Sequence, residues 1–303
     1  MNKIVPCLWF DGVAEQAVAL YTSIFGNSRV GRINRYGREG QEIHAMPEGA
    51  VMTVDFEIDG YSLVGLNGGP HFRFSPANSF FVTLETEAEV DAVWAALVEY
   101  GTVLMPLQAY DWSGRYGWLN DRYGLSWQVM LGEREDMGRP IAPCLMFIGP
   151  QHARAEEALE LYTSVFPDSR IQSIHRYQES DADPTGTIKH ARFRLGGETF
   201  IVLESALAHD FGFTEAVSYT VRCDTQDEID HYWNALSADP EAERCGWIKD
   251  RFGVSWQIVP TMLAELLQDP DPERSQRVMA ALMSMKKLDI QALKQAYANP
   301  GTG

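Results

Sequence analysis

The chain has 303 residues, and 42 acidic against 25 basic side chains give it a formal net charge of −17. This balance argues against binding to nucleic acid or to an anionic membrane surface, because both need a basic surface. No apolar run approaches the roughly 20 residues that span a bilayer, and no signal-peptide pattern precedes the first strand-like segment. We therefore expect a cytoplasmic, globular protein with enough chain for two domains.

The first part of the chain predicts the element order β-α-β-β-β. An apolar run bounded by Asp11 and Gly12 is typical of a buried strand, and a helix with apolar side chains on one face follows it. Asp59 and Gly60 form a turn dipeptide between two strands of a hairpin. The expected elements cover residues 4–10, 14–25, 29–36, 50–58 and 61–66.

The same order then begins again. An alternating strand over residues 79–85 is followed by an amphipathic helix over residues 88–100, which Gly101 ends. Three further strands are expected over residues 102–107, 116–120 and 125–131. The first part of the chain thus contains two β-α-β-β-β units.

The chain then repeats itself. GWLNDRYGLSWQ at residues 117–128 returns as GWIKDRFGVSWQ at residues 246–257, and IVPCLWF at residues 4–10 returns as IAPCLMF. Because the period exceeds a hundred residues, the repeating unit is a domain and not a solenoid turn. We expect one domain over residues 1–135, a second over residues 139–260, and a helical extension over residues 261–303.

The segments CLWF, LYTSIFG, GGPHF, VDAVWAAL and GWLNDRYGLSWQ resemble the vicinal oxygen chelate superfamily of glyoxalases, bleomycin-resistance proteins and dioxygenases. Within it, they are most similar to the PhnB-like subgroup, also labelled demethylubiquinone methyltransferase-like. The resemblance implies an α+β fold in which four βαβββ units form two open barrels, one per repeat. It also implies that the repeats pack as an intramolecular pseudo-dimer, with further homodimer formation left open.

In metal enzymes of this superfamily, the ligands come from the first, fourth, fifth and eighth strands. The resemblance places these positions at Pro6, Asn67, Ser79 and Gln128 in the first repeat, and at Pro143, Glu204, Ser218 and Gln257 in the second. Of these, only Glu204 is a good ligand for a divalent cation. We therefore expect no metal and no other cofactor. The polar residues either bind an organic ligand or satisfy one another's hydrogen bonds.

Three further residues are candidates for the cleft rim. His71 follows a Gly-Gly-Pro loop, His209 lies beside Asp210 in the counterpart loop, and Trp112 lies where an aromatic side chain would cover the cleft. Glu204, His209 and His71 are the catalytic candidates, because a histidine titrates near neutrality and burial raises the pKa of a carboxyl group.

Three functions stay open. The first is binding of a small organic ligand without a catalytic metal, and the acidic charge would suit a cationic ligand. The second is a lyase, isomerase or dioxygenase activity. The third is a structural or regulatory role with vestigial, filled clefts. Methyltransferase activity is not expected, because no glycine-rich loop follows a strand to bind adenosylmethionine.

Overall fold

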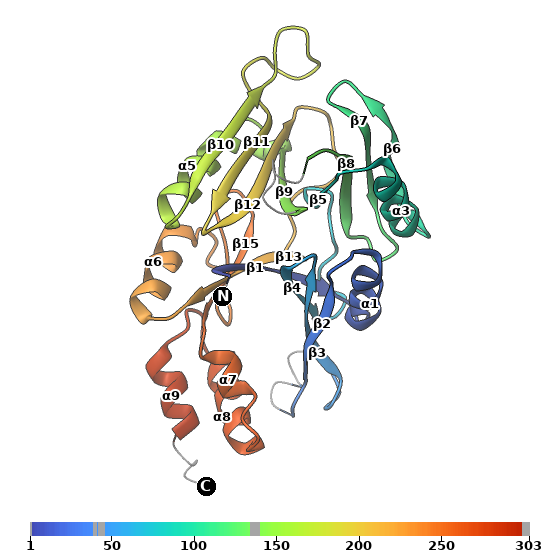
Figure 1. The fold of residues 1–303 in the computed structure, drawn as a ribbon. Coiled ribbons are helices and arrows are strands. Elements are labelled where there is room, and N and C mark those ends of the chain that lie inside the picture. The colour runs from blue at the N-terminus through green and yellow to red at the C-terminus, as the bar shows by residue number, and fades with distance from the viewer. Residues whose placement is uncertain (1, 39–40, 42–45, 134–139, 299–303) are drawn as a thin grey trace.

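The computed structural model describes residues 2–38, 41, 46–133 and 140–298. Within them lie two mixed sheets with helices against them, and a helical C-terminal extension (Figure 1). This is the predicted α+β class. The predicted junction between the domains, at residues 135–139, lies outside the described residues.

Sheet A has seven strands in the order β14-β15-β13-β1-β4-β3-β2. Their bounds are β1 (Ile4–Phe10), β2 (Arg29–Arg35), β3 (Val51–Ile58), β4 (Tyr61–Asn67), β13 (Val217–Cys223), β14 (Trp247–Lys249) and β15 (Ser255–Pro260).

Sheet B has eight strands in the order β10-β11-β12-β9-β5-β8-β7-β6. Their bounds are β5 (Asn78–Leu84), β6 (Thr102–Tyr110), β7 (Ser113–Asn120), β8 (Ser126–Leu131), β9 (Ile141–Ile148), β10 (Arg170–Arg176), β11 (Ile188–Leu195) and β12 (Glu198–Ser205).

Each sheet combines one half of each repeat, so the expectation that each repeat forms its own barrel is wrong. In sheet A, β1 of the first repeat pairs antiparallel with β13 of the second. In sheet B, β5 of the first repeat pairs antiparallel with β9 of the second. The two repeats are therefore joined through both sheets by backbone hydrogen bonds.

Four helices lie against the sheets: α1 (Ala14–Ile24), α3 (Glu87–Val98), α5 (Ala155–Val165) and α6 (Gln226–Leu236). The threonine before α3 starts it with a capping box, in which Thr86 and Glu89 exchange side-chain and backbone hydrogen bonds. The helices and the sheet faces toward them enclose one continuous apolar core. In the described part of the chain, no helix is long and apolar enough to cross a membrane.

Two buried aspartates connect the turns of the repeated GWxxDxxGxSWQ block to a helix. Asp121 accepts hydrogen bonds from the hydroxyl of Tyr21 and the indole of Trp127, and Asp250 does the same with Tyr162 and Trp256. Neither aspartate forms an ion pair with the arginine that follows it in the described chain. Arg122 pairs with Glu99 and Arg251 pairs with Glu157.

The C-terminal extension contains α7 (Leu263–Leu267), α8 (Pro272–Met283) and α9 (Ile290–Ala298), which lie together below the sheets in Figure 1. They share a small apolar core around Leu263, Val278 and Leu293. The backbone N–H of Cys245 donates to the carbonyl oxygen of Met285. Tyr116, the counterpart of Cys245, pairs instead with Gln108 of β6. The extension thus takes the place beside β14 of sheet A that β6 has beside β7 in sheet B.

Candidate functional site

The face of sheet B that points away from the helices forms a concave surface, which we call face B. The ring centroids of His190 on β11 and Phe81 on β5 are 6.3 Å apart. On a flat sheet these strands, separated by β12 and β9, would lie roughly 14 Å apart. The sheet is therefore strongly curled, with these side chains on its inner side.

A buried polar cluster forms the floor of face B. The amide nitrogen of Gln128 donates to the hydroxyl of Ser79 at 2.8 Å and lies 3.6 Å from the sulfur of Cys144. Its carbonyl oxygen accepts a hydrogen bond of 2.7 Å from the hydroxyl of Tyr116. Only 1% of the Gln128 surface is exposed. These groups satisfy one another's hydrogen bonds, so none of them is left free to bind a ligand. The floor instead supports the side chains that lie above it.

The equivalent floor of sheet A, on a surface we call face A, is simpler. The amide nitrogen of Gln257 donates to the hydroxyl of Ser218 at 2.9 Å, and Ser218 lies opposite Cys7 in the strand register. Cys245 stands where face B has Tyr116, so the Gln257 carbonyl lacks that phenol and the side chain is half-buried. The two floors combine residues of both repeats. The assignment of Asn67, Ser79 and Gln128 to one cleft is therefore wrong.

Asn67 and Glu204 were expected in the clefts, and the structure places them on the opposite side of the sheets. The side-chain oxygen of Asn67 accepts a hydrogen bond from the backbone N–H of Ala14, the first residue of α1. Glu204 accepts one from Ala155, the first residue of α5, and another from Ile188. A carboxylate stabilises a helix N-terminus by capping it and by opposing its dipole. Glu204 thus lies outside the cleft, where it cannot act as an acid or base on a ligand there.

The first-strand positions also differ from the expectation by one residue. Ile141, Leu145 and Phe147 belong to the helix-side core, so Pro143 points toward the helices and Cys144 points into face B. The same alternation puts Cys7, and not Pro6, on face A. Burial raises the pKa of the Cys144 thiol to about 12 and that of Cys7 to about 11.

These residues do not fit a divalent metal. The donors on face B at the expected strands are a protonated thiol, a hydroxyl and an amide, whereas metal sites use thiolate, imidazole or carboxylate. Across the described part of the chain, no three His, Cys, Asp or Glu side chains lie together so that they could hold a metal ion.

The residues also do not fit an adenosyl cofactor bound in the way that doubly wound α/β folds bind it. Such sites use the N-terminus of the helix after the first strand to bind the anionic part of the ligand. Here the N-termini of α1 and α5 are already occupied by Asn67 and Glu204.

The three rim candidates lie in different surroundings. His71 is exposed in the loop after β4. His209 is half-buried, and its Nε2 lies 3.1 Å from the hydroxyl of Ser205 at the end of β12. Trp112 lies in the turn between β6 and β7, is 55% exposed, and stacks on Tyr110 at 4.9 Å. Of the three, Trp112 is the one whose ring contacts Tyr116 on face B.

Face B also carries a basic wall that we did not predict. Ala191, Phe193 and Leu195 of β11 face the helices, so the residues between them point inward. With their cross-strand partners on β10, these inward side chains are His190 and His175, Arg192 and Ser173, and Arg194 and Arg170. The spacing of His190, Arg192 and Arg194 at every second residue of a strand was the signal in the sequence.

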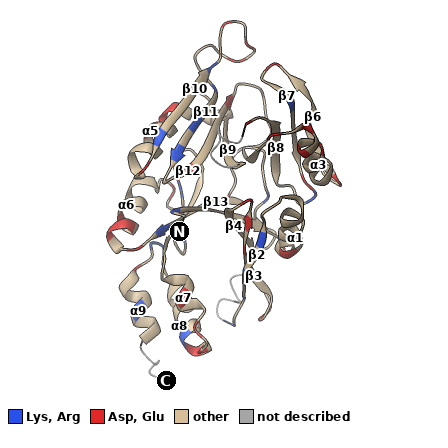
Figure 2. Cartoon of the chain, viewed as in Figure 1, with Lys and Arg blue, Asp and Glu red and all other residues tan. Residues whose placement is uncertain are grey.

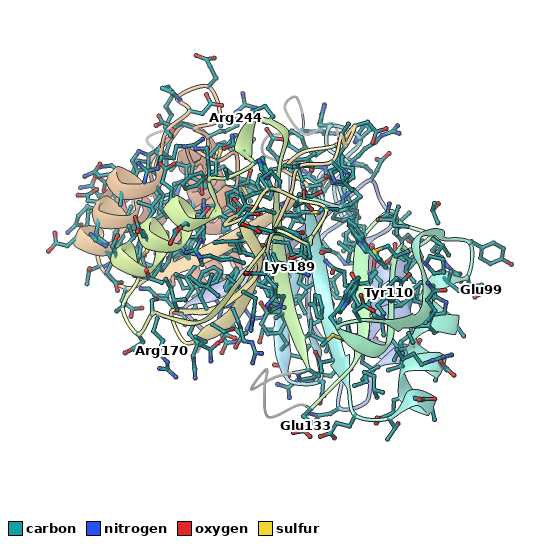
Figure 3. All side chains as sticks on the ribbon, turned by 90° about the horizontal axis from the view of Figure 1, so that it is seen from above. Glu99, Tyr110, Glu133, Arg170, Lys189 and Arg244 are labelled. Atoms are coloured by element: carbon teal, nitrogen blue, oxygen red, sulfur yellow. The ribbon has the colours of Figure 1, made fainter. Side chains whose placement is uncertain are left out.

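A strip of rings crosses face B from the basic wall to the β6–β7 hairpin. The ring of Phe81 lies 6.3 Å from His190 on one side and 6.2 Å from Tyr116 on the other. Tyr116 in turn contacts Tyr110 and Trp112, both at 5.7 Å. Seen from above, the labelled Lys189 of β11 and Tyr110 of β6 lie on the two sides of the central strands of sheet B (Figure 3).

A hollow of about 240 Å³ lies beyond the end of β9, beside the loop that contains His209. Its lining includes Met146, Phe211, Phe213 and Phe252. Met146 is the counterpart of Trp9, whose ring contacts Phe72 at 4.9 Å in the first repeat. A larger hollow of about 450 Å³ lies at the ends of β5 and β8, near Glu85 and Glu133. Neither is lined by Gln128, so neither lies over the floor of face B.

A family model described as 3-demethylubiquinone-9 3-methyltransferase matches residues 2–130 and 139–259. The match covers both repeats and leaves out the C-terminal extension. None of the curated proteins compared with the chain is similar to it.

Two solved structures illustrate the likeness. A putative 3-demethylubiquinone-9 3-methyltransferase, PhnB protein, from Bacillus cereus is 41% identical, over 43% of this chain and 100% of that one, with a TM-score of 0.40. Glyoxalase I from Zea mays is 11% identical over 89% of this chain and 98% of that one, with a TM-score of 0.52. The second likeness extends over both repeats and shows a glyoxalase-like fold.

Proposed function

The chain belongs to the family described as 3-demethylubiquinone-9 3-methyltransferase, and we propose that it binds a small organic molecule on face B without a catalytic metal. The observation that carries the proposal is the ring strip, which runs from His190 through Phe81 to Tyr116 and Trp112. A concave surface lined by rings, with a few polar groups around it, is typical of sites for small organic ligands.

Face B suits this role better than face A, because the extension crosses the mouth of face A. Gln268, directly after α7, contacts Arg32 and donates to the side-chain oxygen of Asn34 at 2.9 Å. Both partners lie on β2, at the edge of sheet A opposite to β14 and β15. Face B keeps an exposed ring at its rim, since Trp112 is 55% exposed.

A structural role is the second candidate, and the closed floor favours it. Gln128, Ser79 and Tyr116 use their hydrogen bonds on one another, and a site filled by its own side chains needs no ligand. The two candidate functions make different predictions, because only the binding function requires a ligand that contacts Trp112 and His190.

A cytoplasmic location is part of the proposal. All four cysteines are free thiols, as is usual in a reducing compartment.

A fragment screen by NMR tests the binding function. We expect flat aromatic fragments to bind and to shift the indole resonance of Trp112 and the ring resonances of His190. Trp112→Ala should weaken such binding by about 1–3 kcal/mol, the usual scale for a lost aromatic anchor.

Tyr100→Ala is the matched control, because Tyr100 is also an exposed aromatic, at 81%, but lies at the end of α3 away from the strip. If no fragment binds, or if the two variants weaken binding equally, face B is not the site and the structural role is favoured.

A further inference from the structure

The charge on face B contrasts with the charge of the whole protein. Strands β10 and β11 carry Arg170, Arg176, Lys189, Arg192 and Arg194, and neither strand contains an aspartate or a glutamate. Figure 2 shows this hairpin with blue segments and no red on its strands. In a chain with a net charge of −17, such a segment is a local exception.

The inward-facing members of this basic wall lack counter-charges. Within the described residues, His175, His190 and Arg192 form no ion pair, and the Nε of Arg192 is buried with no hydrogen-bond partner. The hydroxyl of Ser173, which lies opposite Arg192 in the strand register, is also buried without a partner. A buried donor that is left unpaired destabilises the folded state. Two such groups on neighbouring strands therefore indicate a missing partner.

Face A carries the opposite sign of charge at the position of Arg192. Arg192 is aligned with Ile201 and Cys144 in sheet B, and Asp55 is aligned with Val64 and Cys7 in sheet A. The counterpart of Arg192 is therefore an acid.

The neighbours of Asp55 are paired with one another. Glu57, the counterpart of Arg194, forms an ion pair with Arg29 at 2.8 Å. The side chain of Asn34 donates to Thr53 at 2.8 Å. Asp55 itself lies near the opposite charges of Arg32 and Arg222, whereas Arg192 forms no ion pair within the described residues.

The electrostatics of His190 agree with this picture. Burial, together with the charge of Arg192 and the neighbouring His175, lowers the pKa of His190 to about 4. The imidazole is thus neutral at physiological pH, and an anion placed beside it would stabilise its protonated form.

We propose that the ligand of face B is a flat organic anion, whose anionic group is bound by Arg192, Ser173 and His190 and whose ring packs against the ring strip that ends at the exposed Trp112. This inference rests on the proposed binding function and names the chemical class of its ligand. Arginine suits the task because its guanidinium donates to both oxygens of a carboxylate. The proposed anionic ligand is the opposite of the cationic ligand that the net charge of the chain led us to expect.

Three matched probes test the class of ligand: 2-naphthoate, 2-naphthamide and 2-naphthylmethylamine, which share a ring system and differ in charge. We expect 2-naphthoate to bind at least about tenfold more tightly than the amide at low ionic strength, and the amine to bind most weakly. Binding of the carboxylate, and not of the amide, should raise the pKa of His190 measured by NMR.

Arg192→Gln removes the central charge, and Arg29→Gln makes the same change in charge on sheet A. Arg192→Gln should reduce the affinity for 2-naphthoate about tenfold and leave that for the amide unchanged, whereas Arg29→Gln should change neither. The melting temperature of each variant shows whether it is folded.

The inference on charge is overturned if wild-type protein binds the carboxylate and the amide equally, or if Arg192→Gln leaves the preference intact. Either outcome would leave the proposed binding function uncontradicted. If neither these probes nor any fragment binds, the binding function and the inference on charge are both wrong.

Discussion

Replacing Asp121 by asparagine is a direct test of the network that joins each repeated turn to its helix. One carboxylate oxygen accepts from the hydroxyl of Tyr21 at 2.7 Å and from the indole of Trp127 at 2.9 Å. The other accepts from the backbone N–H groups of Tyr123 at 2.8 Å and Leu125 at 3.1 Å. All four partners are donors, and an asparagine has an acceptor on one side only.

The expected loss in the free energy of unfolding follows from the number of donors left without an acceptor. With its oxygen toward the two backbone N–H groups, the amide keeps those two bonds, and its NH2 group can donate to the hydroxyl of Tyr21, which also accepts. The indole N–H of Trp127 then loses its partner, at a cost of about 1–3 kcal/mol. One effect opposes this loss. Burial raises the pKa of the Asp121 carboxyl group, so the ionised form carries a desolvation cost that asparagine removes. We expect a net loss of about 1–2 kcal/mol in the free energy of unfolding.

Urea unfolding followed by circular dichroism measures this loss. Tyr21→Phe removes one of the four hydrogen bonds and should cost about 1–2 kcal/mol. Asp111→Asn makes the same chemical change at an exposed turn residue and should stay within about 0.5 kcal/mol of wild type. If Asp121→Asn is as stable as wild type or more stable, the desolvation of the charge outweighs its hydrogen bonds and the reasoning is refuted.

Three further predictions concern the titration of face B, the placement of Glu204 and the exchange of strands. His190 should titrate near pH 4, with Arg192, His175 and Phe81 facing it. Because the unfolded chain takes up this proton below about pH 6.5 and the folded chain does not, stability should fall by up to about 3 kcal/mol between pH 6.5 and 4. His190→Asn should lack this component, and a titration midpoint near 6.5 would contradict the burial. Glu204→Gln should destabilise the fold by about 1–3 kcal/mol, because the NH2 group of the new amide would face the N–H of Ala155 or of Ile188, which are both donors. Fragment binding on face B should stay unchanged. Weaker binding with normal stability would show that Glu204 contributes to the ligand site. Residues 1–135 expressed alone should form a dimer in light scattering, because β1 and β5 would lack β13 and β9; a stable folded monomer would show that one repeat closes on itself.

The elements and their order could be predicted from the chain, because local periodicity carries that information. The apolar run of β1 and the turn of Asp59 and Gly60 lie where they were expected. One alternative for the polar residues, that they satisfy one another's hydrogen bonds, could be predicted as well. Ser79 with Gln128, and Ser218 with Gln257, form hydrogen-bonded pairs on the concave faces.

The amino-acid sequence alone thus determined the repeat, the family and the type of each element, since these depend on residues close together in the chain. Tertiary structure decided which strands share a sheet, and so which repeat supplies each wall of a cleft. Pairing of β5 with β9 joins Ser79 to Cys144, which no local pattern specifies, because backbone hydrogen bonds are the same for every pair of strands. It also decided which way a side chain points, since a slip of one residue reverses the face of a strand. This is why Cys144 replaced Pro143 on face B, and why Glu204 lies at a helix N-terminus instead of in the cleft.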